Sequence, residues 1–357
     1  MNTFAFTICF AVWMVNAVLV TFLVDNQIFD WTPVQIGWLI GIPVLTGALF
    51  RLPAGLLTDK LGGKPVFTSL LLLCGIPMFA LSYVDSFFGY ALCSLGFGLS
   101  GASFAVGIAY SSVWFPKNKQ GTALGIFGAG NAGAAITTLV GPKLLIILTD
   151  SKTNLEGWRT FPQIYAGFLV FTAILFFFFT ENRKSSAENK TLKQQLLPLK
   201  NIRVWRFGLY YFLVFGCFVA FAGWLVPYYT NVYHLDLVTA GILASCFSLP
   251  SGLIRVVGGW MSDTWGARKV MYWVLSSTVI VSIMLVIPKM DIYADGKGVV
   301  SKQSGIVTEV TATYVKVGEV PYPIVIKSNK LDNSDTEIHI LPIKETWQEA
   351  IVKVGDV

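Results

Sequence analysis

Nine apolar stretches occupy most of this chain, and each is long enough to cross a lipid bilayer as a helix, which takes about 20 residues. Only 13% of the residues are charged, whereas a soluble domain carries about 25%. The sequence therefore predicts an all-α polytopic membrane protein embedded in a lipid bilayer. The predicted spans cover residues 4–24, 34–57, 65–84, 87–115, 121–147, 162–180, 207–230, 237–262 and 269–288.

An internal repeat relates the two ends of this series. The stretch GALFRLPAGLLTDKLGGK at 47–64 reappears as SGLIRVVGGWMSDTWGARK at 251–269. The pairs Arg51/Arg255 and Asp59/Asp263 are each separated by 204 residues. A duplication with this offset predicts two bundles related by an axis along the membrane normal.

The polar segments between the spans suggest the domain order and the orientation. We expect a six-span bundle at 1–182, a linker at 183–206 and part of a second bundle at 207–290, with spans 7–9. Basic residues gather on one side, in the linker and in the loops after spans 2, 4 and 8. The positive-inside rule then places these loops and the N-terminus in the cytoplasm.

The composition changes after Pro288. Residues 291–357 are polar and β-branched, with short alternating runs broken by Gly, Pro and Asn. This pattern predicts a small antiparallel unit, which an odd number of spans would place outside the cytoplasm. It faintly resembles a biotinyl/lipoyl barrel sandwich, but no lysine lies in a motif such as MKM, so no cofactor is expected.

Both copies of the repeat end in the same turn motif. It reads Gly-xxx-Asp-xx-Gly-x-Lys/Arg, and we expect the carboxylate to cap or pair with a neighbouring helix end while glycine permits the tight turn. We predict that these residues gate or brace the cytoplasmic face. They are Gly55, Asp59, Gly62 and Lys64 in the first copy, and Gly259, Asp263, Gly266 and Arg268 in the second.

Arg51 and Arg255 each precede their aspartate by eight residues, about 12 Å of helix. Such an arginine can reach the interface by snorkelling, but the distance is long for that. A charge inside a span costs at least ~2.5–3.5 kcal/mol and usually marks a pathway. Because no acidic residue lies deep in any predicted span, we interpret a mobile anion as the missing partner.

The fifth span contains the stretch GTALGIFGAGNAGAAITTLVGP, beginning at Gly121. Gly121, Gly125, Ala129 and Gly133 recur at i, i+4 and predict a small-residue face for close helix contact. Asn131 has two interpretations: its amide donates to an anion, or it makes a simple interhelical hydrogen bond.

These motifs are similar to those of a known family. The stretches FPKNKQGTALGIFGAGNAG and LFRLPAGLLTDKLGGK, with the span pattern over about 1–288, resemble the nitrate/nitrite porter family of the major facilitator superfamily. That fold has twelve spans, so we expect the chain to stop after the ninth. The second glycine signature of the family belongs to span 11.

The resemblance also implies a binding site. In the family, one arginine on span 2 and one on span 8 clamp the anion, beside a glycine-rich signature on span 5 and pocket aromatics. The implied site is Arg51, Arg255, Asn131, Gly128, Gly130, Tyr211, Phe215 and Phe104. Tyr211 is the less specific match, since Tyr210 is adjacent, and any single aromatic can equally serve packing.

The expected function is nitrate/nitrite transport in the inner membrane by a monomer working through alternating access. The lack of a titratable residue deep in the predicted spans favours exchange over proton coupling. Three alternatives stay open: proton-coupled nitrate uptake, transport of another small monovalent anion such as formate, and a non-transporting anion sensor or assembly partner.

Other classes of function find no support in the sequence. The five cysteines are scattered singly, with no spacing typical of a metal site or a disulfide framework. The net charge of +6 is explained by the loops and needs no nucleic acid. GIFGAGNAG matches a dinucleotide fingerprint poorly, and no nucleophile–base pair is evident, so we expect no enzyme, no cofactor and no metal.

Overall fold

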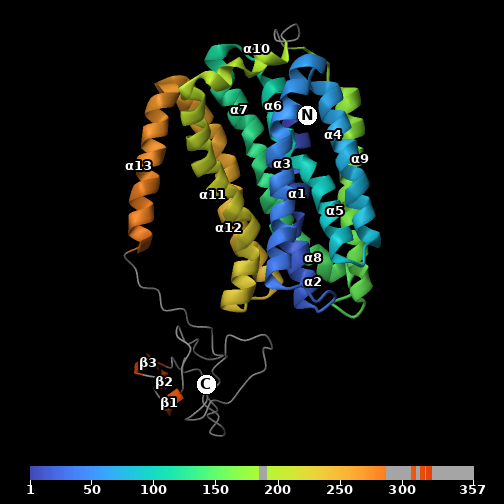
Figure 1. Ribbon diagram of the computed structural model, residues 1–357, viewed down its shortest axis with the longest axis vertical. Coiled ribbons are helices and arrows are strands. Elements are labelled where there is room, and N and C mark those ends of the chain that lie inside the picture. Colours follow the sequence, from blue (N-terminus) through green and yellow to red (C-terminus); the bar gives the residue numbers. More distant parts are fainter. Residues whose placement is uncertain (185–190, 287–306, 311–313, 318, 324–357) are drawn as a thin grey trace. The chain divides into compact units, whose positions relative to one another are not determined.

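The computed structural model of the chain describes residues 1–184, 191–286, 307–310, 314–317 and 319–323 (Figure 1). The chain divides into two compact units, Met1–Ser277 and Thr278–Val357. The first unit is a bundle of long helices. Its principal elements are α1 Asn2–Trp13, α2 Val15–Asp25, α3 Pro33–Leu61, α4 Gly63–Ala80, α5 Phe87–Phe97, α6 Ser103–Ser112, α7 Gln120–Gly128, α8 Gly133–Leu148, α9 Thr160–Phe179, α10 Leu192–Leu196, α11 Ile202–Tyr233 and α12 Leu237–Met261.

Eight helical stretches of the described chain are long and apolar enough to cross a membrane. The first seven match the first seven predicted spans. The eighth, Leu237–Met284, has 48 residues, about twice the length that one crossing needs. A π-helical turn at Ser262–Gly266 interrupts it, and α13 Ala267–Val286 follows. Two crossings in this stretch agree with the prediction of an eighth and a ninth span.

Three spans contain interruptions that the sequence pattern did not indicate. Span 1 breaks between α1 and α2 at Met14. Span 4 holds a 3₁₀ turn at Gly98–Ala102, between α5 and α6, and span 5 holds another at Ala129–Ala132, between α7 and α8. The turn in span 5 coincides with the glycine-rich stretch around Asn131.

The helix starts follow ordinary capping chemistry. Thr32 caps α3 in a capping box with Gln35, and Pro33 occupies the first helical position. Asp236 caps α12 by accepting hydrogen bonds from the Thr239 hydroxyl and the Thr239 backbone N–H. These two donors hold the pKa of Asp236 below its ordinary value.

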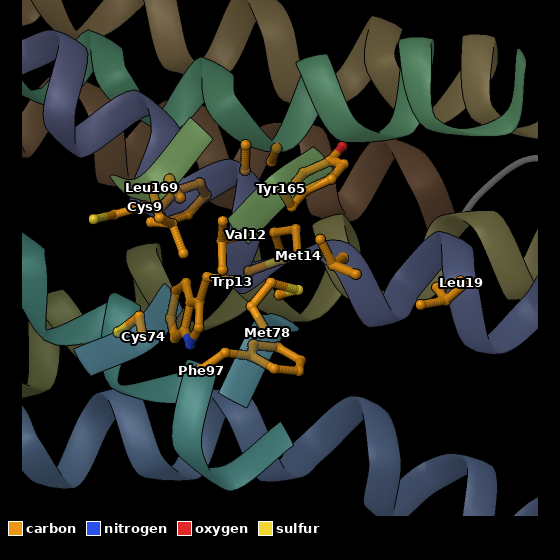
Figure 2. Packing of buried hydrophobic residues seen from close by; sticks show 14 of the residues in the cluster. Cys9, Val12, Trp13, Met14, Leu19, Cys74, Met78, Phe97, Tyr165 and Leu169 are labelled. Atoms are coloured by element: carbon orange, nitrogen blue, oxygen red, sulfur yellow. The ribbon is translucent and has the colours of Figure 1, made fainter. Parts of the chain in front are cut away.

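The core of the first unit is centred on the helices of span 1. Most residues of α1 and α2 are buried, and they pack with aromatic and aliphatic side chains of α4, α5 and α9 (Figure 2). Helix α12 packs along the whole of span 5, against α7, the 3₁₀ turn and α8. Span 5 therefore lies between α1 on one side and α12 on the other.

Three strands of the second unit are described: β1 Val307–Val310, β2 Tyr314–Val317 and β3 Val320–Pro323. They form an antiparallel sheet in the order β1-β2-β3. The prediction of short antiparallel strands after the last span is confirmed for this segment. The barrel-sandwich resemblance concerns residues that lie largely outside the described ones, and it stays a prediction.

Candidate anion site

Arg51 lies in the middle of α3, and its guanidinium is held by two hydrogen bonds. Nε donates to the carbonyl of Gly101 at 3.3 Å, in the 3₁₀ turn of span 4. Nη1 donates to the hydroxyl of Tyr211 at 3.1 Å, on α11. Three spans (2, 4 and 7) therefore fix one end of the site. The second bond joins the two halves of the internal repeat.

The two repeated arginines converge on a single aromatic ring. The guanidinium carbon of Arg51 lies 4.8 Å from the ring centroid of Phe215, and that of Arg255 lies 5.5 Å from the same centroid. The two charges are therefore no farther apart than the sum of these distances. Side chains 204 residues apart in sequence thus form one cluster.

The predicted pocket aromatics stack beside Arg51. Tyr211 and Phe215 lie 4.8 Å apart at an interplanar angle of 13°. Phe104 stacks with Phe215 at 5.5 Å and with Tyr211 at 6.0 Å. The structure brings Tyr211 into the cluster, whereas the ring of the adjacent Tyr210 contacts Phe207. These rings offer their faces to the guanidinium of Arg51, an arrangement that stabilises a partly desolvated cation.

Neither arginine has a carboxylate within ion-pair distance among the residues that the structure describes. The ion pairs found there join Arg159, at the start of span 6, to Glu156 in the same turn and to Asp85 in the loop after span 3. Both Arg51 and Arg255 are half-buried, and the Nε of Arg255 is buried with no hydrogen-bond partner in the described part of the chain. The cluster therefore carries two positive charges and an unused buried donor.

Glycines of span 5 set the position of Arg255. A Cβ at Gly125 would lie 2.5 Å from the carbonyl oxygen of Arg255, and one at Gly128 would lie 3.2 Å from its Cδ. At Gly125 a side chain would collide with the backbone of Arg255, and at Gly128 it would require the Arg255 side chain to shift by a few tenths of an ångström. The glycine-rich stretch of span 5 therefore packs directly against Arg255.

Gly130 and Asn131 face other neighbours. A Cβ at Gly130 would meet the ring of Phe6 on α1. The Nδ2 of Asn131 donates to the carbonyl of Gly128 at 2.6 Å, and Gly128 is the last residue of α7. Its Oδ1 is buried without a partner among the described atoms. In this conformation the Asn131 amide ties the 3₁₀ turn to the end of α7.

The turn motif of the second repeat caps a helix, as its residue types predict. The Asp263 carboxylate accepts from the backbone N–H of Gly121 at 2.8 Å and from the backbone N–H of Thr122 at 2.7 Å. The Thr122 hydroxyl donates to it at 2.8 Å. Gly259 packs directly on Gly121. Asp263 thus ties the end of α12 to the start of α7.

Replacing Asp263 with alanine is expected to lower the thermal midpoint of the detergent-solubilised protein by a few degrees and to loosen this end of α7. Asp263→Asn should fall between wild type and Asp263→Ala, because the amide retains one acceptor oxygen. Differential scanning fluorimetry measures the order. Thr264→Ala is the matched control, since among the described residues the Thr264 hydroxyl bonds to the carbonyl of Trp260, one turn earlier in the chain. Equal midpoints for all four proteins would contradict the capping role.

The first copy of the motif braces the end of span 6. Gly62 has φ +90°, a conformation that favours glycine, and Asn182 donates to the carbonyl of the preceding Leu61 at 2.9 Å. The ammonium of Lys64 lies 4.6 Å from the ring centroid of Phe177. A Cβ at Gly55, on α3, would lie 4.0 Å from the Cβ of Ala105, and Asp59 lies in the last turn of the helix.

The remaining motif residues, Gly266 and Arg268, lie at the start of α13. Gly266 has φ +89°, and Arg268 is exposed. A cavity of about 620 Å³ opens beside Asp263, lined by residues that include Phe127, Trp260 and Thr122. Neither arginine lines it. Across the described residues, no group of three or more His, Cys, Asp or Glu side chains is placed to hold a metal ion.

Two aromatic residues that contact the arginines were not predicted from the sequence. Phe218 packs against Arg255, with the guanidinium carbon 5.3 Å from its ring centroid. Trp13 packs against Arg51 at 5.5 Å. A signal for Trp13 existed, since a tryptophan halfway along a span is unusual for a residue that concentrates at membrane interfaces.

Comparison with known proteins agrees with this architecture. The family model of the Major Facilitator Superfamily matches residues 3–300. A solved structure of a bacterial homologue of the human lysosomal transporter Spinster, in an inward-facing and occupied conformation, is similar at a TM-score of 0.54 with 17% identity. It covers 74% of this chain and 62% of that one. At this identity the similarity concerns the fold alone.

Curated relatives share more sequence. The chain is 40% identical over 294 residues to a Thermus thermophilus protein named "Probable nitrate/nitrite antiporter NarK1" (81% of this chain, 66% of that protein). It is 29% identical over 300 residues to the "Nitrite extrusion protein" of Bacillus subtilis (83% and 73%). It is 31% identical over 267 residues to "Probable nitrate transporter NarT" of Staphylococcus epidermidis (75% and 66%).

This chain thus spans about two thirds of the length of the Thermus and Staphylococcus relatives. The family match, the helical architecture and these relatives agree with the resemblance carried by the repeat and by the glycine-rich stretch. The chain belongs to the major facilitator superfamily and, within it, to the nitrate/nitrite porter family.

Proposed function

We propose that this protein transports nitrate and nitrite across the inner membrane by alternating access, with the anion held between Arg51 and Arg255. The observation that carries the proposal is the convergence of both guanidinium groups on Phe215, with no described carboxylate to neutralise either one. Relatives named as nitrate/nitrite antiporter and nitrate transporter support this choice of substrate.

The chemistry of the cluster suits a small planar or bent oxyanion. Guanidinium groups donate paired hydrogen bonds in a plane, which matches two oxygens of one anion. No described residue accepts from the buried Nε of Arg255 or from Nη2 of Arg51. An anion bound here would replace its hydration shell with these donors. It would also neutralise charge that is costly within a membrane.

The aromatic rings favour flat substrates. Phe215 lies against both guanidinium groups, and Phe104 and Tyr211 stack in line with it. A flat ring face beside the guanidinium groups would fit against a planar anion more readily than against a tetrahedral one. We therefore expect discrimination against sulfate and phosphate by shape as well as by charge.

We further propose that transport is an exchange of nitrate for nitrite. Within the described spans, every acidic side chain lies near a helix end, where it is remote from a mid-membrane proton path: Asp25, Asp59, Glu156 and Asp263. An empty site with two positive charges would be costly to reorient. A bound anion lowers that cost, so the loaded protein should convert between states faster than the empty one.

Reconstituted full-length protein tests the exchange. Proteoliposomes loaded with nitrite should take up external ¹⁵N-nitrate, while empty liposomes should show little uptake. A protonophore should leave the initial rate unchanged. Equal uptake without internal anion, or loss of uptake on collapse of a proton gradient, would contradict exchange. A competition panel with formate and small organic acids addresses the alternative substrates, since stronger inhibition by formate than by nitrite would contradict the substrate assignment.

Orientation belongs to the same proposal. We place the N-terminus and the basic linker in the cytoplasm, and both lie at the same end of the bundle (Figure 1). The Asp263 cap is at the cytoplasmic end of span 8 in this orientation. We also propose a monomer as the working unit.

A further inference from the structure

We propose that Trp13 is a positioning residue for the anion site. It determines the position of Arg51 by packing on the backbone of two spans and by placing the face of its indole ring against the guanidinium. This inference rests on the proposed function of Arg51 and goes beyond it. The roles assigned to the predicted cluster do not include Trp13.

Trp13 is anchored by its indole nitrogen. It is the last residue of α1, at the break in span 1, and only 2% of its surface is exposed. It is one of the buried residues drawn in Figure 2. Nε1 donates to the carbonyl of Pro43 on α3 at 2.7 Å. Pro43 precedes Arg51 by eight residues on the same helix, so this bond ties span 1 to the helix that carries the arginine.

Two glycines make room for the indole. A Cβ at Gly47 would lie 2.8 Å from Nε1 of Trp13, and one at Gly101 would lie 2.5 Å from its Cε2. Gly47 lies one turn before Arg51, and Gly101 provides the carbonyl that accepts from Arg51 Nε at 3.3 Å. The indole therefore packs on both backbone segments that determine where the guanidinium lies.

Trp13 also contacts the charge itself. The guanidinium carbon of Arg51 lies 5.5 Å from the ring centroid, within the range of a cation–π contact. A ring face stabilises a cation without using its in-plane N–H groups. Trp13 can thus help to hold Arg51 in a desolvated place while the in-plane N–H groups that are not bonded to Gly101 or Tyr211 stay available to an anion. Packing alone would not require an indole nitrogen bonded to this helix.

The test compares Trp13→Phe and Trp13→Leu with wild type in two assays. The first is nitrate exchange in proteoliposomes. We expect KM for nitrate to rise about threefold in Trp13→Phe and about tenfold in Trp13→Leu, graded by the loss of the N–H bond and then of the ring. The turnover rate at saturating nitrate should stay within about twofold, because weakened anion binding acts on KM first.

The second assay needs no substrate. Phenylglyoxal modification, followed by peptide mass spectrometry, measures the reactivity of individual arginines. Arg51 should react about two- to fivefold faster in the Trp13 variants than in wild type, while Arg255 in the same sample should keep its rate. If wild type fails to exchange nitrate but Arg51 alone becomes more reactive, the proposed function fails and the positioning role stands.

Trp158→Phe is the matched control. Trp158 is fully buried in the 3₁₀ turn that precedes α9, and its Nε1 has no described partner. This variant should lower the thermal midpoint without changing KM or the reactivity of Arg51. In an Arg51→Lys background, Trp13→Phe should change anion affinity no further while still lowering the midpoint. Trp13 variants that lose thermal stability but keep both wild-type KM and wild-type Arg51 reactivity would overturn the inference.

Discussion

Arg51→Lys and Arg255→Lys are each expected to reduce nitrate exchange by about 100-fold or more, the loss typical of removing one partner from a buried charged contact. Lysine keeps the positive charge, so folding and membrane insertion should be retained. It offers a point charge on a flexible chain instead of a planar fork, and it cannot reproduce both hydrogen bonds that Arg51 makes to Gly101 and Tyr211. Initial rates of ¹⁵N-nitrate uptake measure the effect.

Arg268→Lys is the control for this pair. It makes the same chemical change at an exposed position, 13 residues beyond Arg255, and should exchange nitrate at the wild-type rate. In the proposed site, each half of the repeat contributes one arginine that the anion needs. A wild-type rate of nitrate exchange in either Arg51→Lys or Arg255→Lys would therefore contradict the two-arginine site.

Gly259→Ala is expected to destabilise the fold strongly. The added Cβ would collide with the backbone carbonyl of Gly121, an atom that cannot move without shifting the start of α7. Overpacking of this kind typically costs about 1–3 kcal/mol. Helix α12 also carries Arg255 and leads to Asp263, so exchange should slow as well. The thermal midpoint in detergent and the yield of monodisperse protein report the loss.

The adjacent Gly258→Ala is the matched control, because a Cβ there meets no described atom within 4 Å. Both substitutions raise intrinsic helix propensity by the same amount. The contrast between them therefore isolates the contact between α12 and α7. Similar midpoints for the two variants would show that the close approach of these helices does not determine the stability of the bundle.

The spans could be predicted from sequence because hydropathy depends only on composition along a window. Long apolar runs such as that of α11 have one stable solution in a bilayer, since every backbone group must bond internally. The break between α12 and α13 was also predictable, from Gly266 and the charged turn around it. The helix interruptions in spans 1, 4 and 5 were not, because 3₁₀ turns and a change of helix leave hydropathy unchanged.

The glycine stretch shows where a local pattern fails. The i, i+4 spacing from Gly121 to Gly133 predicts one small-residue face, yet Gly121 and Gly125 contact α12, whereas Gly133 contacts α1. The intervening turn Ala129–Ala132 is 3₁₀. Its tighter winding, 3.0 instead of 3.6 residues per turn, rotates the face by roughly 80° over four residues. One pattern in sequence thus serves two interfaces.

Only part of the candidate site could be predicted from the sequence. Arg51 and Arg255 stand out in sequence because charge is rare inside a span, and the repeat links them without any structure. Their convergence on Phe215 depends on the packing of α3, α11 and α12 and could not be derived from spacing. Phe218 was missed because a phenylalanine in an apolar run is ordinary. The mid-span position of Trp13 is unusual, but only the neighbours of such a residue distinguish a packing role from a positioning one.

A structure of the full-length protein determined with nitrate tests the central claim most directly. We expect a single anion beside Phe215, with its oxygens about 2.7–3.2 Å from guanidinium nitrogens of both Arg51 and Arg255. Nitrate bound by one arginine alone, or bound in the cavity beside Asp263 with both arginines unchanged, would contradict it.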